Sequence, residues 1–324
     1  MGCEDSDAGT ALEQFRAEMK TKTELNRKIL DHLLHDAFGD QEQLEAESEL
    51  VLDPEPTDET IADVLGRHGF REVDHAYSNL MDLATEKITF LSTRRCRHFL
   101  ASIAPRLLRA IATTPDPDAT LVNLSLVSES LGGKGALWEL FSFNPPSLTL
   151  YVKLCASSPY LSGILTSNPG MIDELMDSLL LDKLPTLAPL AKTLSELCRG
   201  AEDIEQILHS FKNSEHLRVG VRDILGKVDI QAAHRALSDI AEACLCEVAR
   251  REYDRLVRRH GVPTIQGGPL DGQACSLVIL ALGKLGGREP NYHSDLDLVF
   301  VYDACGFTQP SRRGDRHEST SNQH

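Results

Sequence analysis

The chain has 324 residues, and its hydrophobic share of 41% and charged share of 25% are typical of soluble globular proteins. Its formal net charge of −16 argues against nucleic-acid binding, because proteins that grip phosphate backbones use clustered Lys and Arg. No apolar run approaches the roughly 20 residues that cross a bilayer, and the acidic start Met1-Gly2-Cys3-Glu4-Asp5 is unlike a signal peptide, so we expect a cytoplasmic protein that binds no membrane.

Residues 1–55 are predicted to form an N-terminal helix followed by an acidic linker. From Leu12 to Leu34, apolar residues recur at steps of three and four, which indicates one face of a helix. The sequence from Leu52 to Asp58 has the composition of a linker. We place the start of the next helix at Asp58, because Thr57 is followed three residues later by Thr60 rather than Glu and is a weak cap.

Residues 56–262 are predicted to form a domain of successive helices, broken by Pro and Gly. Apolar stripes within 171–180 and 217–225 indicate two of these helices. A later helix is expected to begin at the cap Ser238 and to end at Gly261. The turn or helix-start signals in this domain are at 114–118, 144–146, 158–159 and 168–170.

The pattern changes in 263–303, where a second domain is expected to begin. The continuous apolar run 275–282 predicts a buried strand, and the alternation in 296–302 predicts a second strand. Residues 304–324 are assigned to a polar tail. Because 308–324 contains no aliphatic or aromatic side chain, we expect no further strand of the sheet from it.

The segment between the two predicted strands carries the candidate chemistry. Asp295 and Asp297 alternate at the head of the second strand, which places both carboxylates on one side of the sheet. Two carboxylates held this close favour a shared hard cation, and Mg²⁺ bound by them and by substrate phosphates fits the pattern. Taken singly, an Asp-x-Asp pair is more often a solvated strand edge than a metal site.

A glycine-rich turn precedes the acid pair. Glycines let backbone N–H groups approach a phosphate, and a lysine or arginine beside them is able to contact the same phosphates. A turn of this kind is usually only a turn, and a lone Lys usually lies on the surface. The candidate nucleotide-binding residues are Gly283, Lys284, Gly286, Gly287, Arg288 and Ser294.

The glycine turn and acid pair together resemble the signature of the DNA polymerase β nucleotidyltransferase superfamily. The chain more specifically resembles the bacterial glutamine synthetase adenylyltransferase/adenylyl-removing enzyme family. The resemblance is carried by residues 283–289 and 292–300, and by the earlier segments 155–161, 168–175 and 211–218. The resemblance implies a mainly α chain, with a multi-helix domain followed by the first strands of an α/β nucleotidyltransferase (polymerase β-like) domain. His293, beside the acids, is assigned a positional role.

The family's members adenylylate and de-adenylylate a tyrosine of glutamine synthetase and so regulate nitrogen assimilation. The resemblance implies Mg²⁺ as cofactor, ATP as substrate, and glutamine synthetase and a PII signalling protein as partners. The sequence of residues 292–297 is similar to that of the C-terminal, adenylylating half of the family enzyme. The alternative is a non-catalytic helical interaction module that binds glutamine synthetase or a PII protein and whose active site is incomplete.

A third catalytic carboxylate is implied by the resemblance and is not found at the expected place. Asp303, Asp315 and Glu318 are the only acids after Asp297, and none of them lies in a predicted strand that faces the pair. We therefore expect the second domain to be truncated and the chain by itself to be inactive as an adenylyltransferase.

Overall fold

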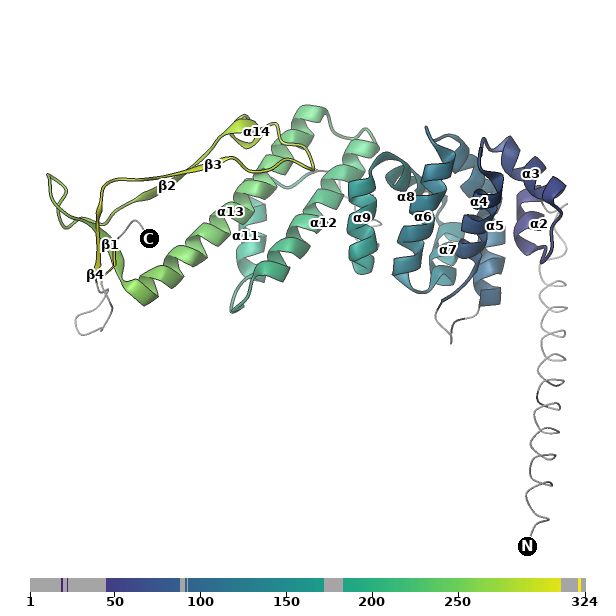
Figure 1. The fold of residues 1–324 in the computed structure, drawn as a ribbon, viewed down its shortest axis with the longest axis horizontal. Coiled ribbons are helices and arrows are strands. Elements are labelled where there is room, and N and C mark those ends of the chain that lie inside the picture. The colour runs from purple at the N-terminus through teal and green to yellow at the C-terminus, as the bar shows by residue number, and fades with distance from the viewer. Residues whose placement is uncertain are drawn as a thin grey trace, which may run out of the picture.

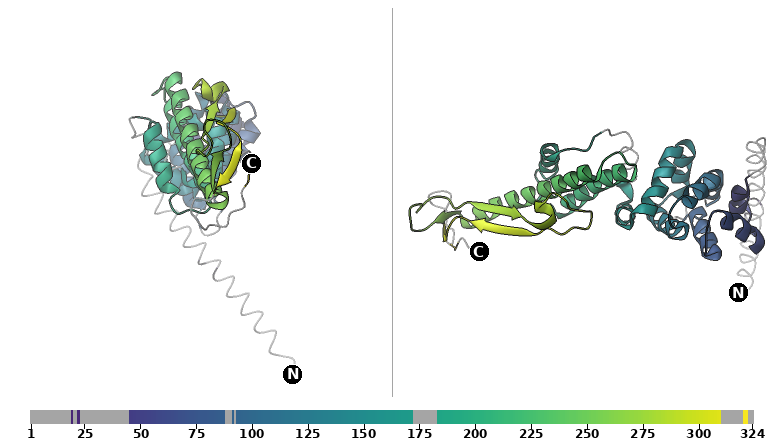
Figure 2. Two further views of the ribbon diagram at one scale, coloured as in Figure 1. Left: turned by 90° about the vertical axis from the view of Figure 1, so that its left-hand side faces the viewer. Right: turned by 90° about the horizontal axis from the view of Figure 1, so that it is seen from above.

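The computed structural model describes residues 45–87, 91, 93–171, 183–309 and 320–321, together with Met19 and Lys22. These residues form an elongated molecule, with helices along most of its length and strands at one end (Figures 1 and 2). The mainly α prediction is confirmed. Apart from Met19 and Lys22, the N-terminal helix predicted around 12–34 lies outside the described residues, and so does most of the stripe at 171–180.

The first part of the helical body consists of short helices that pack around one core. Cap and proline positions set several of the helix starts. These helices are α2 (Ala46–Leu52), α3 (Asp58–Arg67), α4 (Val73–Ala84), α5 (Thr93–Ala112), α6 (Pro117–Leu131), α7 (Lys134–Phe143), α8 (Pro145–Ser157), α9 (Pro159–Ser167) and the 3-10 turn η1 (Pro169–Met171).

The predicted turn signals coincide with helix starts. Pro117, Pro145 and Pro159 each occupy the first turn of a helix, where a missing backbone N–H costs no hydrogen bond. The Ser158 side chain accepts a hydrogen bond from Leu161 N and caps α9. Helix α3 begins at Asp58, as predicted, and Thr57, which was judged a weak cap, does cap it by accepting a hydrogen bond from Thr60 N.

Large aromatic side chains fill the centre of the first core. Trp138, Phe141 and Tyr151 are 0% exposed. The ring centroid of Phe141 lies 6.1 Å from that of Trp138 and 5.3 Å from that of Tyr151. Their polar atoms are satisfied, because Trp138 Nε1 donates to Leu83 O over 3.0 Å and Tyr151 Oη shares a hydrogen bond with Ser128 Oγ. Leu50 of α2 is buried in the same core. The boundary near residue 55 stays a prediction, although α2 already packs with the helices that follow it.

A second hydrophobic cluster lies between α11 (Leu187–Leu197), α12 (Glu205–Ile224) and α13 (Ile230–His260). Helix α12 joins the two clusters, because Leu217 and Val221 face the first and Phe211 and Val219 face the second. The stripe predicted within 217–225 is therefore confirmed as a buried face, and its helix also buries a second face.

Helix α13 begins earlier than the sequence pattern predicted. Asp229 caps it by accepting a hydrogen bond from Ala232 N, whereas Ser238 lies inside the helix and donates to His234 O. The prediction of Ser238 as the cap was wrong, because its hydroxyl bonds back to the preceding turn as helical serines do. Gly261 ends the helix with φ 91°, as predicted.

Two antiparallel ribbons follow α13. Strand β1 (Val262–Ile265) pairs with β4 (Gly306–Gln309), and β2 (Leu277–Ala281) pairs with β3 (Leu298–Tyr302). The two strands predicted at 275–282 and 296–302 are therefore confirmed with shorter bounds. The expectation that 308–324 adds no strand was wrong in part, because Thr308 and Gln309 pair with β1 in the other ribbon. Backbone pairing there requires no apolar side chain.

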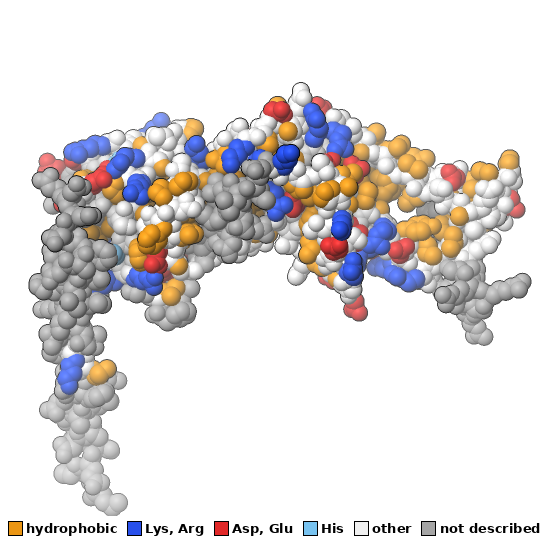
Figure 3. All heavy atoms as spheres, turned by 180° about the vertical axis from the view of Figure 1, so that it is seen from behind, with side chains coloured by type: hydrophobic (Ala, Val, Ile, Leu, Met, Phe, Trp, Pro, Cys, Tyr) orange, Lys and Arg blue, Asp and Glu red, His pale blue; other side chains and the backbone are white. Residues whose placement is uncertain are grey.

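The β2–β3 ribbon runs alongside α13, and its tip points back toward α12 (Figures 1 and 2). Both of its faces carry exposed apolar side chains, with Phe300 at 59% on one face and Val278 at 51% on the other. In Figure 3, which shows the back of the molecule, apolar side chains gather over this end. No helix among the described residues is long and apolar enough to cross a membrane.

Candidate active site at the tip of the β2–β3 ribbon

The residues predicted to carry chemistry lie together in the loop that joins β2 to β3. The two strands pair in register from Leu277↔Tyr302 to Ala281↔Leu298. One further hydrogen bond, from Leu282 N to Asp297 O over 2.8 Å, continues the ladder into the loop. The ribbon thus closes residues 283–296 into a tip with the glycine turn on one side and the acid pair on the other. We call residues 282–297 the site loop.

The glycine turn lies directly against Asp297. Residues Gly283–Gly286 form the single helical turn α14, and Gly283 has φ 52°, a conformation that favours glycine. A Cβ at Gly283 would overlap the carboxylate oxygen Oδ2 of Asp297. Glycine is therefore required for the carboxylate to lie over the backbone of the turn.

The structure shows a packing role for Gly286. Its φ is not positive, so another residue would not adopt a forbidden angle. Instead, a Cβ there would come within 2.5 Å of Ala281 O, the carbonyl at the end of β2. The bare Cα lets α14 fold back against the strand. Packing against β2 thus explains why glycine is needed at position 286. A contact of Gly286 with phosphate stays a prediction.

The two acids are both exposed in the loop ahead of β3. Ser294, just before them, has its hydroxyl within the turn 291–294, where it accepts from Asn291 N over 2.9 Å and donates to Asn291 Oδ1 over 3.0 Å. This turn is closed further by Ser294 N donating to Asn291 O. Ser294 therefore shapes the approach to Asp295, while its predicted contact with the nucleotide stays a prediction.

Two exposed carboxylates suit a cation whose other ligands are water molecules and substrate oxygens. Mg²⁺ is bound in this way, through one or two carboxylates and phosphate oxygens, so the donor set at Asp295 and Asp297 fits it. Among the described residues, no group of three or more His, Cys, Asp or Glu side chains is arranged to hold a metal. Asp303 lies at the other end of the ribbon, where its carboxylate accepts from Ser276 N over 2.8 Å. Asp315 and Glu318 lie outside the described residues.

The two candidate basic residues differ in their surroundings. Lys284 is exposed on α14. Arg288 forms ion pairs with Asp239 and with Glu242 of α13, the latter over 3.1 Å. It is also the only non-glycine residue with positive φ among the described residues, at 55°. Such backbone strain persists where surrounding contacts hold it, and here the two acids of α13 hold it.

These contacts of Arg288 were not predicted from the sequence. Asp239 and Glu242 are three residues apart on α13 and so lie on one face, where together they attract a cation. Burial opposes the charge of the Arg288 guanidinium, but the hydrogen bonds and charges of Asp239 and Glu242 raise its pKa above the ordinary value. The spacing of the two acids could have indicated a cation-binding face of α13. Their partner Arg288 could not have been predicted, because it lies 46 to 49 residues away in the sequence.

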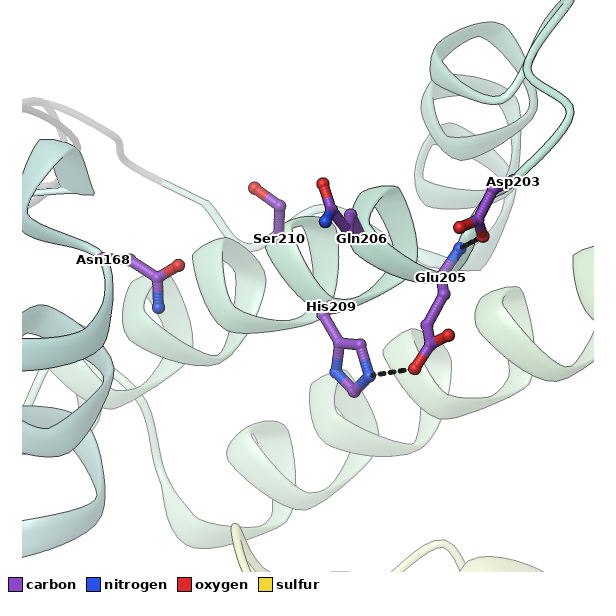
Figure 4. Close-up of a pocket in the computed structure, with 6 residues that line it drawn as sticks. All are labelled: Asn168, Asp203, Glu205, Gln206, His209 and Ser210. Carbon is purple, nitrogen blue, oxygen red and sulfur yellow. Dashed lines mark hydrogen bonds and ion pairs between the residues drawn. The ribbon is translucent and has the colours of Figure 1, made fainter.

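A hollow on the surface lies elsewhere. It measures about 500 Å³ and is polar, and Figure 4 shows its lining around the start of α12: Asn168, Asp203, Glu205, Gln206, His209 and Ser210. None of these six lining residues belongs to the site loop. The hollow is therefore separate from the acid pair.

Comparison with known proteins decides the family. Residues 148–323 match the family model described as glutamate-ammonia ligase adenylyltransferase, a range that includes the glycine turn and both acids. The chain belongs to this family. The resemblance seen in the sequence motifs is thereby confirmed, and the alternative of a non-catalytic module is not favoured.

Individual relatives agree. The bifunctional glutamine synthetase adenylyltransferase/adenylyl-removing enzyme of Pseudomonas aeruginosa is 34% identical over 262 residues, which cover 79% of this chain and 26% of the relative. The protein of the same name from Nitrosococcus oceani is 29% identical over 317 residues, covering 96% of this chain and 32% of that protein. The chain thus spans about a quarter to a third of the length of these curated relatives.

Proposed function

We propose that the chain carries an adenylyl-transfer site that moves AMP from ATP to a tyrosine of glutamine synthetase, with Asp295 and Asp297 as the ligands of Mg²⁺. Support comes from the family membership and from one geometric observation. The site loop folds back so that the Asp297 carboxylate lies over the bare backbone of Gly283. This brings the carboxylate that we propose as a Mg²⁺ ligand beside the turn that we propose to contact phosphate.

In the proposed reaction, the tyrosine oxygen forms a bond to the α-phosphorus of ATP. The bond from that phosphorus to the bridging oxygen breaks, pyrophosphate leaves, and the hydroxyl proton is released. A bound Mg²⁺ would neutralise phosphate charge during the transfer. The chain's own residues would orient the nucleotide: the two acids from β3's side, and the exposed Lys284 from the turn.

The Mg²⁺-binding roles and the tyrosine target belong to this proposal, as does assignment to the adenylylating half of the family enzyme. PII as a partner and a role in nitrogen regulation are likewise proposed by analogy with the family. The helical body would bind the protein substrate and hold it near the site loop, because helices form most of the described surface.

The test is metal and nucleotide binding by the 324-residue chain. Mn²⁺, as a spectroscopic substitute, should bind in the presence of ATP, and Asp295→Asn or Asp297→Asn should each weaken this binding at least about tenfold. Asp74→Asn, at an exposed acid of α4, is the matched control and should bind as the unchanged chain does. Equal binding by all variants would contradict the assignment.

Transfer itself is best measured with the chain continued by the remaining sequence of the Pseudomonas aeruginosa relative. Labelled AMP should then reach glutamine synthetase, and either Asp→Asn change should reduce the rate by at least about 100-fold. The 324-residue chain without that continuation is expected to remain at background. Robust transfer by the chain alone would show that one of its own acids completes the site.

A further inference from the structure

Tyr292 connects the site loop to the helical body. It lies three residues before Asp295 and is half-buried. It packs against both hydrophobic clusters of the helical body, the one around α5 to α9 and the one between α11 and α13. A side chain of the loop is thereby held at the junction of the two clusters.

The ring of Tyr292 lies within an aromatic cluster formed by α9, α12 and the loop. Its centroid is 6.0 Å from that of Tyr160 and 6.1 Å from that of His216, the latter in an edge-to-face arrangement at 75°. His293 meets Tyr160 edge-on at 4.7 Å. These separations lie in the range at which aromatic pairs stabilise each other, about 4.5–7 Å.

Polar contacts fix the same cluster. Tyr160 Oη and His216 Nδ1 are 2.8 Å apart, and Tyr292 Oη donates to Asp223 Oδ2 over 3.4 Å. Burial, and then Lys212, lowers the pKa of His216 to about 4, so this ring is neutral at neutral pH. Burial, and then Asp223, raises the pKa of Tyr292, so its hydroxyl keeps the proton that it donates.

The loop needs such an anchor because the ribbon alone gives little support. A two-stranded ribbon is marginally stable by itself, and both acids lie beyond its last paired residues. Metal ligands and reacting groups have to be held to within about 0.5 Å to function well. Arg288 ties one side of the loop to α13, and Tyr292 lies on the acid side, next to the turn closed by Ser294.

We propose that Tyr292 is a positioning residue, which holds Asp295 and Asp297 in place by docking the site loop between α9 and α12. The docking itself follows from the contacts of Tyr292, and only its consequence for metal binding rests on the proposed function. The hydroxyl bond to Asp223 is long, so the ring contacts should contribute more than the hydroxyl does.

The docking is tested by hydrogen exchange in the 324-residue chain. The amides of Leu282, Gly286 and Ser294 form hydrogen bonds within the loop and report its order. Tyr292→Ala should speed exchange in peptides covering 282–297 by about tenfold or more, while α12 keeps its protection. Tyr292→Phe, which keeps the ring, should change it less than about threefold. Tyr253→Ala, at a 39% exposed tyrosine of α13, is the matched control.

The consequence is tested by Mn²⁺ binding in the presence of ATP. Tyr292→Ala should weaken the affinity about tenfold, as losses of supporting residues around metal sites do, and Tyr292→Phe should restore it. If circular dichroism shows that Tyr292→Ala loses helix, Tyr292→Leu replaces it, because it keeps the apolar volume. Unchanged loop exchange in a folded variant without the ring would overturn the proposal. Faster exchange together with no Mn²⁺ binding by the unchanged chain would support the docking and contradict the proposed function.

Discussion

The helical body and the β2–β3 ribbon use the same kinds of apolar residues in opposite ways. In the helical body, Trp138 and Leu107 are completely buried, whereas in the ribbon Val278 and Phe300 are more than half exposed. Both regions form backbone hydrogen bonds, one within helices and the other between two strands. The difference teaches that the stability of this chain resides in helix packing, and that the site loop depends on its contacts with that packed body.

The largest effect should come from the centre of the first core. Trp138→Ala removes a fully buried ring and its hydrogen bond to Leu83 O, and should lower the free energy of unfolding by about 3–5 kcal/mol. Urea unfolding followed by circular dichroism measures this. Phe143→Ala, at a ring that is 81% exposed, should change it by less than about 0.5 kcal/mol. Similar losses from both changes would contradict the division between core and surface.

The next effect concerns a buried charge on α13, that of Glu247. Burial raises the pKa of Glu247, but hydrogen bonds and charges from Arg250 and Arg251 outweigh it, so the pKa is lowered overall. A lowered folded-state pKa gives stability that is present above the unfolded value, about 4.3, and is lost as pH falls through the folded value.

Glu247→Gln tests that charge. It should cost about 1.5–3 kcal/mol at neutral pH, because hydrogen bonds to charged groups are lost, and it should flatten the fall in stability below about pH 4.3. Urea midpoints at several pH values measure both effects. Glu252→Gln, at a 48% exposed partner of Arg255 on the same helix, is the control. If the stability of Glu247→Gln and of the unchanged chain fell in parallel as pH is lowered, another carboxyl group would be responsible for the loss of stability in acid.

A smaller and more local effect is expected at the glycine turn. Gly286→Ala places a Cβ against Ala281 O, and overpacking of this kind costs about 1–3 kcal/mol. The cost should be confined to the ribbon, with faster hydrogen exchange at 282–297 and an unchanged unfolding midpoint for the helices. Gly66→Ala, in α3 with nothing within 4 Å of its Cβ, should instead stabilise the helical body by about 0.5–1 kcal/mol. A common loss of stability from both would show that the regions unfold as one unit.

The smallest effect should come from the ribbon face. Phe300→Ala removes a ring that is 59% exposed, so the unfolding of the helices should shift by less than about 0.5 kcal/mol. The same change should lower the fluorescence of a dye that binds exposed apolar surface. Undiminished dye fluorescence would place the binding surface elsewhere, and a large loss of helical stability would mean that the ribbon supports the body.

Some features were determined by the sequence alone because they depend on neighbours in the chain. Pro117, Pro145 and Pro159 mark helix starts through a fixed backbone angle, and Gly261 marks a helix end through a positive one. The glycine turn and the acid pair were recognisable because they are contiguous, and the family followed from them. The misplaced cap at Ser238 shows the limit of this approach, because one hydroxyl is able to cap a helix or to bond within it.

Other features were decided only by the tertiary structure. Nothing local indicates that α12 buries two faces, that Arg288 pairs with acids of α13, or that Tyr292 docks beside Tyr160 and His216. These partners lie tens of residues or more from one another in the sequence, so only the packing of helices brings them together. The strand at Gly306–Gln309 is similar, since it forms because β1 offers unpaired backbone groups. The sequence thus determined which residues carry the candidate chemistry, and the packing decided what holds them in place.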